Sequence, residues 1–259
     1  MPEDSLLVSG RLVLCPAPAD SFAPIFSDEW LGTELWPAAR TLVAYLERER
    51  RMAARAHRVV ELGAGTGACG LAAALVGATD VLLTDKPSLL PAMQANAAAN
   101  GLAHVRCAAL EWSVHGLRSD ELLEGSDLVL MSDCLNPVYG EQHAVALAAT
   151  LHALLSRAEA QRCFDDDDDI DDDDASQLPL GVLSQTRRGH GEAEAEFFAE
   201  CKRRGMSATL VETAHVPTAD SGTLVGEEVE DDERSDAAAR ACEQHEPSHE
   251  VGLYLLRLG

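Results

Sequence analysis

Short apolar runs alternate with amphipathic stretches along most of the chain. The apolar runs predict strands at 58–62, 80–85, 104–112, 127–133, 179–186, 207–213 and 251–258. Residues with helical periodicity predict helices at 35–51, 67–77, 87–101, 139–160 and 192–205. Strands that alternate with helices across short turns form a parallel sheet covered on both faces, so we expect a three-layer α/β fold. The last two strands have no helix between them and therefore pair most simply as an antiparallel hairpin.

Two acidic stretches interrupt this pattern. Residues 165–174 contain nine Asp, and the stretch 227–250 contains ten acidic residues and two Arg. Such segments bury too little apolar surface to offset their chain entropy, so we predict disordered insertions at 163–177 and 217–250. The remaining sequence divides into an N-terminal extension with short strands, residues 1–34, and one domain, residues 35–259.

The formal charge of −24 is concentrated in the two acidic stretches, which leave only −7 for the rest of the 259 residues. No basic face is visible in the sequence, so we do not expect a nucleic-acid partner. We also expect no signal peptide and no membrane partner, because the chain lacks a basic start followed by an apolar run and lacks 18 consecutive apolar residues. We expect a monomer. The Asp run is either a solvated loop, which we favour, or a segment that attracts a basic partner protein.

Cysteine and histidine spacing limits the chemistry further. The seven Cys are scattered without a CxxC pair, so we expect no disulfide framework and a reducing compartment, cytoplasmic or also nuclear. The nine His form neither HxH nor HExxH, so we expect no metal site.

A glycine-rich turn follows the first predicted strand, in "VVELGAGTGACGLAAAL" at 59–75. A turn of this kind aims backbone N–H groups and a helix N-terminus at a ligand. No Lys follows the glycines, which excludes a P-loop for nucleoside triphosphates. Gly65, Gly67 and Gly70 match GxGxxG, so the spacing alone leaves a nicotinamide dinucleotide open.

Two features argue against a dinucleotide. Glu61 precedes the glycines, and a carboxylate there suits a cationic ligand and repels a pyrophosphate. The predicted antiparallel hairpin is also foreign to the ordinary dinucleotide fold. S-adenosyl-L-methionine is a cation with a ribose diol and no phosphate, and Asp85 ends the second strand where a carboxylate can accept both ribose hydroxyls. The residues therefore favour this methyl donor.

Five motifs together resemble methyltransferase family 16, the lysine methyltransferase-like group of the seven-strand S-adenosylmethionine-dependent methyltransferases. They are "LWPAARTLVAYL", "VVELGAGTG" with "LLTDKP", "ALEW", "LVLMSDCLNPVYG" and "SQTRRGHGEAEAEFF". The resemblance covers residues 30–213 and the final strand. It implies a Rossmann-like seven-strand methyltransferase sheet and protein-lysine N-methylation.

The resemblance also implies a set of cofactor-binding residues. The Trp of the first motif borders the donor, the first glycines carry its methionine end, an acid binds the ribose, a second Trp lies beside the adenine, and the residue before the fourth-strand acid also contacts the donor. In this sequence these positions, together with the strand-end acid, are Trp36, Glu61, Gly63, Ala64, Gly65, Asp85, Trp112 and Ser132.

On the substrate side the resemblance implies an acid followed three positions later by an aromatic residue. Here Asp133 supplies the acid and Asn136 replaces the aromatic, so these two residues are our candidates for the catalytic positions. The nearest aromatic is Tyr139. We expect the Asp133 carboxylate to hold the target ammonium near the sulfonium. Arg187, Arg188 and His190 either shape the substrate rim or form a solvated cluster beside the next helix.

Three classes of function remain open on the sequence. The first is a protein-lysine methyltransferase acting on a lysine side chain of a protein substrate. The second is a methyltransferase for another nucleophile, a His or Arg side chain, an N-terminus or a small molecule, which Asn136 keeps open. The third is a non-catalytic protein that binds S-adenosylmethionine and acts as a scaffold for basic partners.

Overall fold

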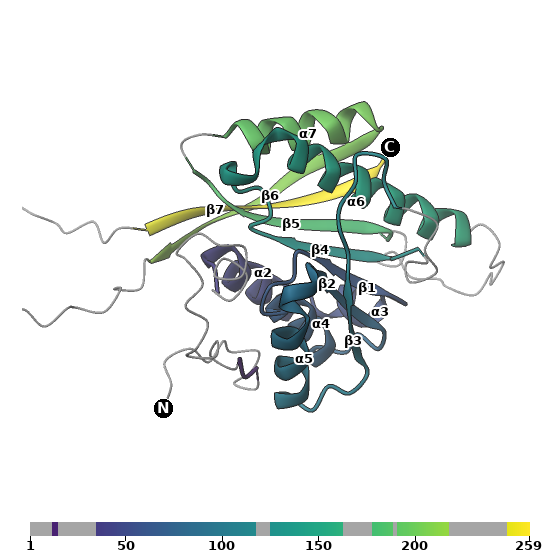
Figure 1. The fold of residues 1–259 in the computed structure, drawn as a ribbon, viewed down its shortest axis with the longest axis vertical. Coiled ribbons are helices and arrows are strands. Elements are labelled where there is room, and N and C mark those ends of the chain that lie inside the picture. Colours follow the sequence, from purple (N-terminus) through teal and green to yellow (C-terminus); the bar gives the residue numbers. More distant parts are fainter. Residues whose placement is uncertain (1–11, 15–34, 118–124, 163–177, 189–190, 218–247) are drawn as a thin grey trace, which may run out of the picture.

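Seven strands form one sheet in the order β3-β2-β1-β4-β5-β7-β6 (Figure 1). The computed structural model describes residues 12–14, 35–117, 125–162, 178–188, 191–217 and 248–259. The strands are β1 (Val59–Leu62), β2 (Val81–Asp85), β3 (Val105–Ala109), β4 (Leu128–Ser132), β5 (Leu180–Thr186), β6 (Met206–Pro217) and β7 (Ser248–Leu258). The helices are α2 (Pro37–Arg48), α3 (Arg50–Arg55), α4 (Ala68–Leu75), α5 (Leu90–Ala99), α6 (Gly140–Arg162) and α7 (Glu192–Arg203), with short 3₁₀ turns η1 (Pro87–Leu89) and η2 (Pro137–Tyr139).

Helices cover both faces of the sheet, as the sequence predicts (Figure 1). On β1, the buried Val59 packs into a core shared with α2, α3, α4 and α5, whereas its neighbour Val60 packs into the core shared with α6 and α7. Successive strand residues point to opposite faces, so a strand buried on both sides must be apolar at every position. β1 meets this condition except at Glu61, which is also buried.

The carboxyl-terminal strands pair antiparallel, which confirms the predicted hairpin. β7 runs antiparallel to both β5 and β6 and lies between them, so β6 forms the edge of the sheet. The β6–β7 ladder extends to the pair Pro217–Ser248. Residues 217 and 248–250, which the sequence assigns to the second acidic insertion, therefore belong to strands, because ladder hydrogen bonds continue there whatever the side chains are.

Other element boundaries differ in ways that matter for the site. The predicted helix 35–51 is divided at Glu49, whose φ of −96° and ψ of 35° separate α2 from α3. The predicted strand 104–112 ends at Ala109, which leaves Leu110 to Trp112 as a connecting segment beside the pocket described below.

The N-terminal extension is described only at residues 12–14, which form no strand. Val13 is held there by two hydrogen bonds with the Asn100 side chain. The rest of the extension and nearly all of both acidic insertions lie outside the described residues. Within the described part of the chain, no helix combines the length and apolarity that a membrane span requires.

Candidate active site

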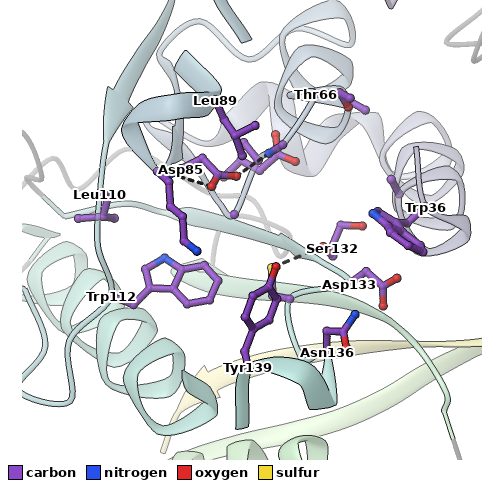
Figure 2. A pocket seen from close by; sticks show the side chains of 18 of the residues that line it. Trp36, Thr66, Asp85, Leu89, Leu110, Trp112, Ser132, Asp133, Asn136 and Tyr139 are labelled. Atoms are coloured by element: carbon purple, nitrogen blue, oxygen red, sulfur yellow. Dashed lines mark hydrogen bonds between the residues drawn. The ribbon is translucent and has the colours of Figure 1, made fainter. Parts of the chain in front are cut away.

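A cavity of about 350 Å³ opens at the carboxyl ends of β1, β2 and β4 (Figure 2). β1 lies between β2 and β4: the chain places β2 and β3 on one side of β1 and then crosses back to place β4 on its other side, so the strand order reverses at β1. Ligands of open α/β sheets bind at such a reversal of strand order. The lining includes all ten residues singled out from the sequence: Trp36, Glu61, Gly63, Ala64, Gly65, Asp85, Trp112, Ser132, Asp133 and Asn136.

The glycine turn brings backbone directly against the pocket wall. Gly63 has a φ of +66°, and a Cβ on it would lie 3.0 Å from the Cys134 Sγ and 3.1 Å from the Trp112 ring. Gly67 has a φ of +81°, and a Cβ there would lie 2.7 Å from Leu83 of β2. A residue with a side chain would therefore be strained at either position and would push the wall outward.

Glu61 lines the pocket, but its carboxylate is turned toward the start of α4. Its Oε2 accepts a hydrogen bond of 2.7 Å from the Gly70 N–H, and the residue is 2% exposed. Burial raises the pKa of Glu61 to about 7, although the hydrogen bond from Gly70 acts to lower it. Glu61 therefore satisfies one free N–H of the helix terminus.

Asp85 joins the end of β2 to the glycine turn. Its Oδ2 accepts a hydrogen bond of 2.7 Å from the Gly65 N–H, and its Oδ1 accepts one of 2.7 Å from the Lys86 N–H. These two contacts orient the carboxylate at the edge of the pocket, which Asp85 lines.

Aromatic rings form the opposite wall of the pocket (Figure 2). The Trp112 ring lies 4.6 Å from the His143 ring, and His143 stacks on Tyr139 at 4.7 Å between centroids. The Lys86 Nζ lies 5.5 Å from the centre of the Tyr139 ring. Lys86 and His143 were not predicted from the sequence, because nothing in their local spacing distinguishes them from surface residues.

Trp36 approaches the pocket from the start of α2. It is the N-cap residue, with an extended backbone at ψ 152°, and Pro37 follows at the first helical position. A residue before proline is restricted to extended conformations, so the sequence fixes the direction in which the chain enters the helix. The Trp36 ring lies 5.8 Å from the Arg188 Cζ, which links it to the substrate side of the site.

Ser132 and Cys134 flank the end of β4. The Ser132 Oγ is buried and has no conventional hydrogen-bond partner among the described residues, with only the Cys69 thiol beside it. The Cys134 Sγ donates to the Leu62 carbonyl at 3.2 Å, and burial raises the pKa of its thiol. A buried hydroxyl without a partner is costly, so Ser132 is suited to a polar ligand in the pocket.

The Asp133 carboxylate is the point at which the structure departs most from the expectation. Arg188 binds it with a two-pronged contact, Nη1 to Oδ1 and Nη2 to Oδ2, both at 2.7 Å. Oδ1 also accepts from the Gln185 Nε2 at 3.0 Å, and Oδ2 accepts from the Thr186 Oγ1 at 3.2 Å. From the sequence we expect this carboxylate to hold a target ammonium. In the structure it already accepts hydrogen bonds from Gln185, Thr186 and Arg188, which follow it by 52 to 55 positions.

Asn136 and Tyr139 both reach the pocket from η2. The Asn136 Oδ1 accepts from the Val138 N–H at 3.1 Å and so caps this short turn. Tyr139, the nearest aromatic in the sequence, lines the same pocket. Of the three polar residues after β5, Arg187 pairs with Glu250, Arg188 pairs with Asp133, and His190 lies outside the described residues.

The residues present fit S-adenosylmethionine. The backbone at Gly63 approaches the cavity closely, the Asp85 carboxylate is oriented toward it, and the two indole rings offer flat apolar faces. The unpartnered Ser132 hydroxyl adds a polar group. Among the described residues, no group of three His, Cys, Asp or Glu side chains is arranged to hold a metal ion.

Comparison with known proteins gives a family match. The family model described as "Lysine methyltransferase" matches residues 27–164, just over half of the chain. The mouse (Mus musculus) protein "EEF1A lysine methyltransferase 3" is 34% identical over 154 residues, which are 58% of this chain and 62% of that protein. "Protein N-lysine methyltransferase METTL21A" from Danio rerio is 35% identical over 139 residues, 50% of this chain and 60% of that protein. The chain thus aligns with less than two thirds of each relative.

Solved structures resemble the fold. A Pyrococcus horikoshii protein provisionally described as an RNA methyltransferase superposes with a TM-score of 0.51 at 15% identity, covering 88% of each chain. At this identity the likeness concerns the fold alone, a seven-strand sheet of the Rossmann-like methyltransferase kind.

Proposed function

The chain belongs to the lysine methyltransferase family, and on this premise we propose that it transfers a methyl group from S-adenosylmethionine to the side-chain nitrogen of a lysine in a protein. The observation that carries the proposal is the pocket itself. One cavity collects Gly63, Asp85, Trp112 and Ser132 from four separate segments, together with Asp133 at the end of β4. The relatives whose names specify lysine methylation support the choice of acceptor.

The residues of this chain would divide the binding of the donor among them. Asp85, oriented by the Gly65 N–H, would accept the ribose hydroxyls, and the Trp112 ring would lie against the adenine. Gly63 to Gly65 would hold the methionine end, where the backbone approaches without side chains. Trp36 would border the reacting end with the electron-rich face that suits a cation.

When bound, S-adenosylmethionine supplies an electrophilic methyl carbon on a sulfonium. Transfer of this carbon to the neutral amine would break the carbon–sulfur bond as the carbon–nitrogen bond forms, and would leave a neutral thioether and a methylated ammonium. The amine must first lose a proton to water, because an ammonium has no free electron pair. The contribution of the protein is then alignment and exclusion of water, without a covalent enzyme intermediate.

A second candidate is supported by Asn136 and by the contacts of Asp133. Asn136 stands where an aromatic residue would be expected in the family motif, and Arg188 already neutralises the Asp133 carboxylate. The neutralised carboxylate suits an acceptor that is not a cation, such as an imidazole. Asn136 also keeps open an arginine side chain, an N-terminus or a small molecule. We rank this candidate below lysine because the family match supports lysine.

The test uses the full chain with radiolabelled S-adenosylmethionine and a cell extract. We expect label on a protein band, and mass spectrometry of that band should locate it on lysine. Label on another residue type would replace lysine with the second candidate. Calorimetric binding of S-adenosylhomocysteine without any label transfer would favour a non-catalytic scaffold. The Gly65→Arg variant, which fills the glycine turn, is the negative control for both measurements.

The partner and compartment follow as part of the same proposal. A basic protein substrate would complement the nine Asp at 165–174 and the acidic stretch 227–250. A reducing compartment, the cytosol or nucleus, agrees with the four described cysteines, which are all free thiols. Fractionation of cells that express the tagged chain would test the compartment.

A further inference from the structure

Arg188 pairs with the Asp133 carboxylate, which lines the pocket at the end of β4. We propose that Arg188 is a specificity-determining residue. Its guanidinium binds the Asp133 carboxylate where a substrate ammonium would bind, and a substrate cation reaches this carboxylate only by displacing the guanidinium. The inference rests on the proposed function, since it assumes that the acceptor enters beside Asp133. It assigns to Arg188 the role of an internal competitor of the substrate.

The first argument is the hydrogen-bond capacity of the carboxylate. Oδ1 accepts from Arg188, from the Gln185 Nε2 and from the Thr186 N–H at 3.3 Å, and Oδ2 accepts from Arg188 and from the Thr186 hydroxyl. Two oxygens offer about four lone-pair positions. All of them are used, so a second cation has no acceptor while Arg188 is bound.

The second argument is that the carboxylate would stay in place without Arg188. Gln185 and Thr186 belong to β5 and remain as donors, and the Gln185 Oε1 accepts from the Leu135 N–H at 3.1 Å. The same glutamine therefore fixes both Asp133 and the turn that follows it. Loss of Arg188 would open acceptor capacity on Oδ2 and leave the orientation of the group unchanged.

The third argument is the difference in exposure of the two partners. The Asp133 side chain is 3% exposed, whereas the Arg188 side chain is 28% exposed. Arg188 also follows the end of β5, outside the ladder, and its guanidinium lies beside the Trp36 ring at the pocket. A partly solvated guanidinium can leave the pair at a smaller cost than a buried one, so exchange with another cation is feasible.

Arg187 provides a matched control one residue away. It is also an arginine in an ion pair, with its Nη1 2.8 Å from the Glu250 Oε1, and its side chain is 47% exposed. The partner of Arg187 lies on β7 and not at the pocket. Arg187→Gln therefore removes an equal charge and an ion pair from the same segment without touching Asp133.

The experiment measures binding of n-butylammonium chloride, a mimic of the lysine side chain, by ligand-observed NMR in the presence of S-adenosylhomocysteine. Arg188→Gln should bind the probe roughly tenfold more tightly than the unmodified chain, since a two-pronged charged competitor is removed. Arg187→Gln should show no gain, and neutral n-butanol should not distinguish the variants. The double variant Arg188→Gln with Asp133→Asn should lose the gain.

Equal affinity of Arg188→Gln and the unmodified chain for n-butylammonium would overturn the inference. So would a gain that persists in the double variant, because the cation would then bind elsewhere. If Arg188→Gln does not fold, Arg188→Lys serves in its place. It keeps the charge but loses the two-pronged contact of the guanidinium, so its gain in affinity for n-butylammonium should be smaller. The label-transfer assay of the unmodified chain tests the proposed function separately, so the two failures are distinguishable.

Discussion

The Glu61 carboxylate of β1 accepts a hydrogen bond from the Gly70 N–H of α4 at 2.7 Å, directly beneath the pocket. A Cβ at position 70 would lie 2.9 Å from the Glu61 Oε2 and 2.3 Å from the Leu83 Cδ2. The contact therefore requires glycine at 70, and it ties the strand end to the helix start. It also buries a titratable group, and this gives the first prediction.

Glu61→Gln should remove the contribution that Glu61 makes to the pH dependence of the free energy of unfolding. Burial raises the pKa of Glu61 from 4.5 to about 7, so the folded chain binds this proton more tightly than the unfolded chain does. The stability from Glu61 is then present at low pH and is lost as the pH rises through 7. From pH 5 to pH 8 the loss is on the order of 2–3 kcal/mol.

The measurement for Glu61 is the free energy of unfolding in urea at several pH values. The free energy of unfolding of the unmodified chain minus that of Glu61→Gln should fall between pH 5 and pH 8 by the amount given above. Other titratable groups contribute equally to both chains and cancel in this difference. A difference that is flat between pH 5 and pH 8 would show that the carboxylate is ionised in the folded chain throughout.

Gly63→Ala should weaken donor binding far more than Gly101→Ala. Both glycines have a left-handed φ, +66° and +68°, so each substitution should cost about 1 kcal/mol of stability. Only at Gly63 does the new methyl meet the pocket wall, at the Cys134 Sγ and the Trp112 ring. Calorimetry with S-adenosylhomocysteine should show roughly tenfold weaker binding for Gly63→Ala and no change for Gly101→Ala.

Trp112→Ala should reduce affinity for S-adenosylhomocysteine by about 1–2 kcal/mol, since the flat ring against the adenine is lost. Trp112→Phe keeps an aromatic face beside His143 and should retain most of the affinity. Isothermal titration of both variants makes the comparison. Equal losses in the two would mean that the indole N–H, and not ring stacking, is the group that binds.

Asp133→Ala should lose turnover while it retains donor binding. The substitution removes the acceptor for Arg188, Gln185 and Thr186, so the turn that carries Asn136 and Tyr139 keeps fewer hydrogen bonds to β5 and is held there less firmly. A small displacement of reacting groups costs roughly 100-fold in rate. Label transfer and calorimetry on the same preparation separate the two effects.

Asp80→Ala is the matched control for Asp133→Ala. Asp80 also binds arginines, the Arg58 Nε at 2.8 Å and the Arg106 Nη2 at 2.7 Å, but it precedes β2 at the opposite end of the strand from the pocket. It should lower stability without lowering turnover. If both variants lose turnover equally, the effect of Asp133 is one of general stability.

The sequence was sufficient to predict features that depend on residues close together in the chain. The apolar run at β1, the glycines after it and Pro37 after Trp36 each restrict the backbone within a few residues, so the strand, the turn and the helix start could be predicted. Carboxyl ends of parallel strands meet at one edge, so Asp85 could be placed at the pocket from its position at the end of a predicted strand, and the family resemblance placed Ser132 there. The antiparallel end of the sheet followed from the missing crossover helix.

The partner of Asp133 could not be predicted in this way. Arg188 is 55 positions away, and whether its guanidinium pairs with Asp133 or remains in solvent depends on how β4 and β5 are placed side by side. The direction of the Glu61 carboxylate, toward α4 and not toward the pocket, likewise depends on the packing of Gly70 against β1. Local sequence restricts torsion angles, whereas the choice among hydrogen-bond partners is made only when distant segments are packed together. The sequence therefore indicated ten of the residues that line the pocket, and the tertiary structure alone added Lys86 and His143 and decided which of the charges are already paired.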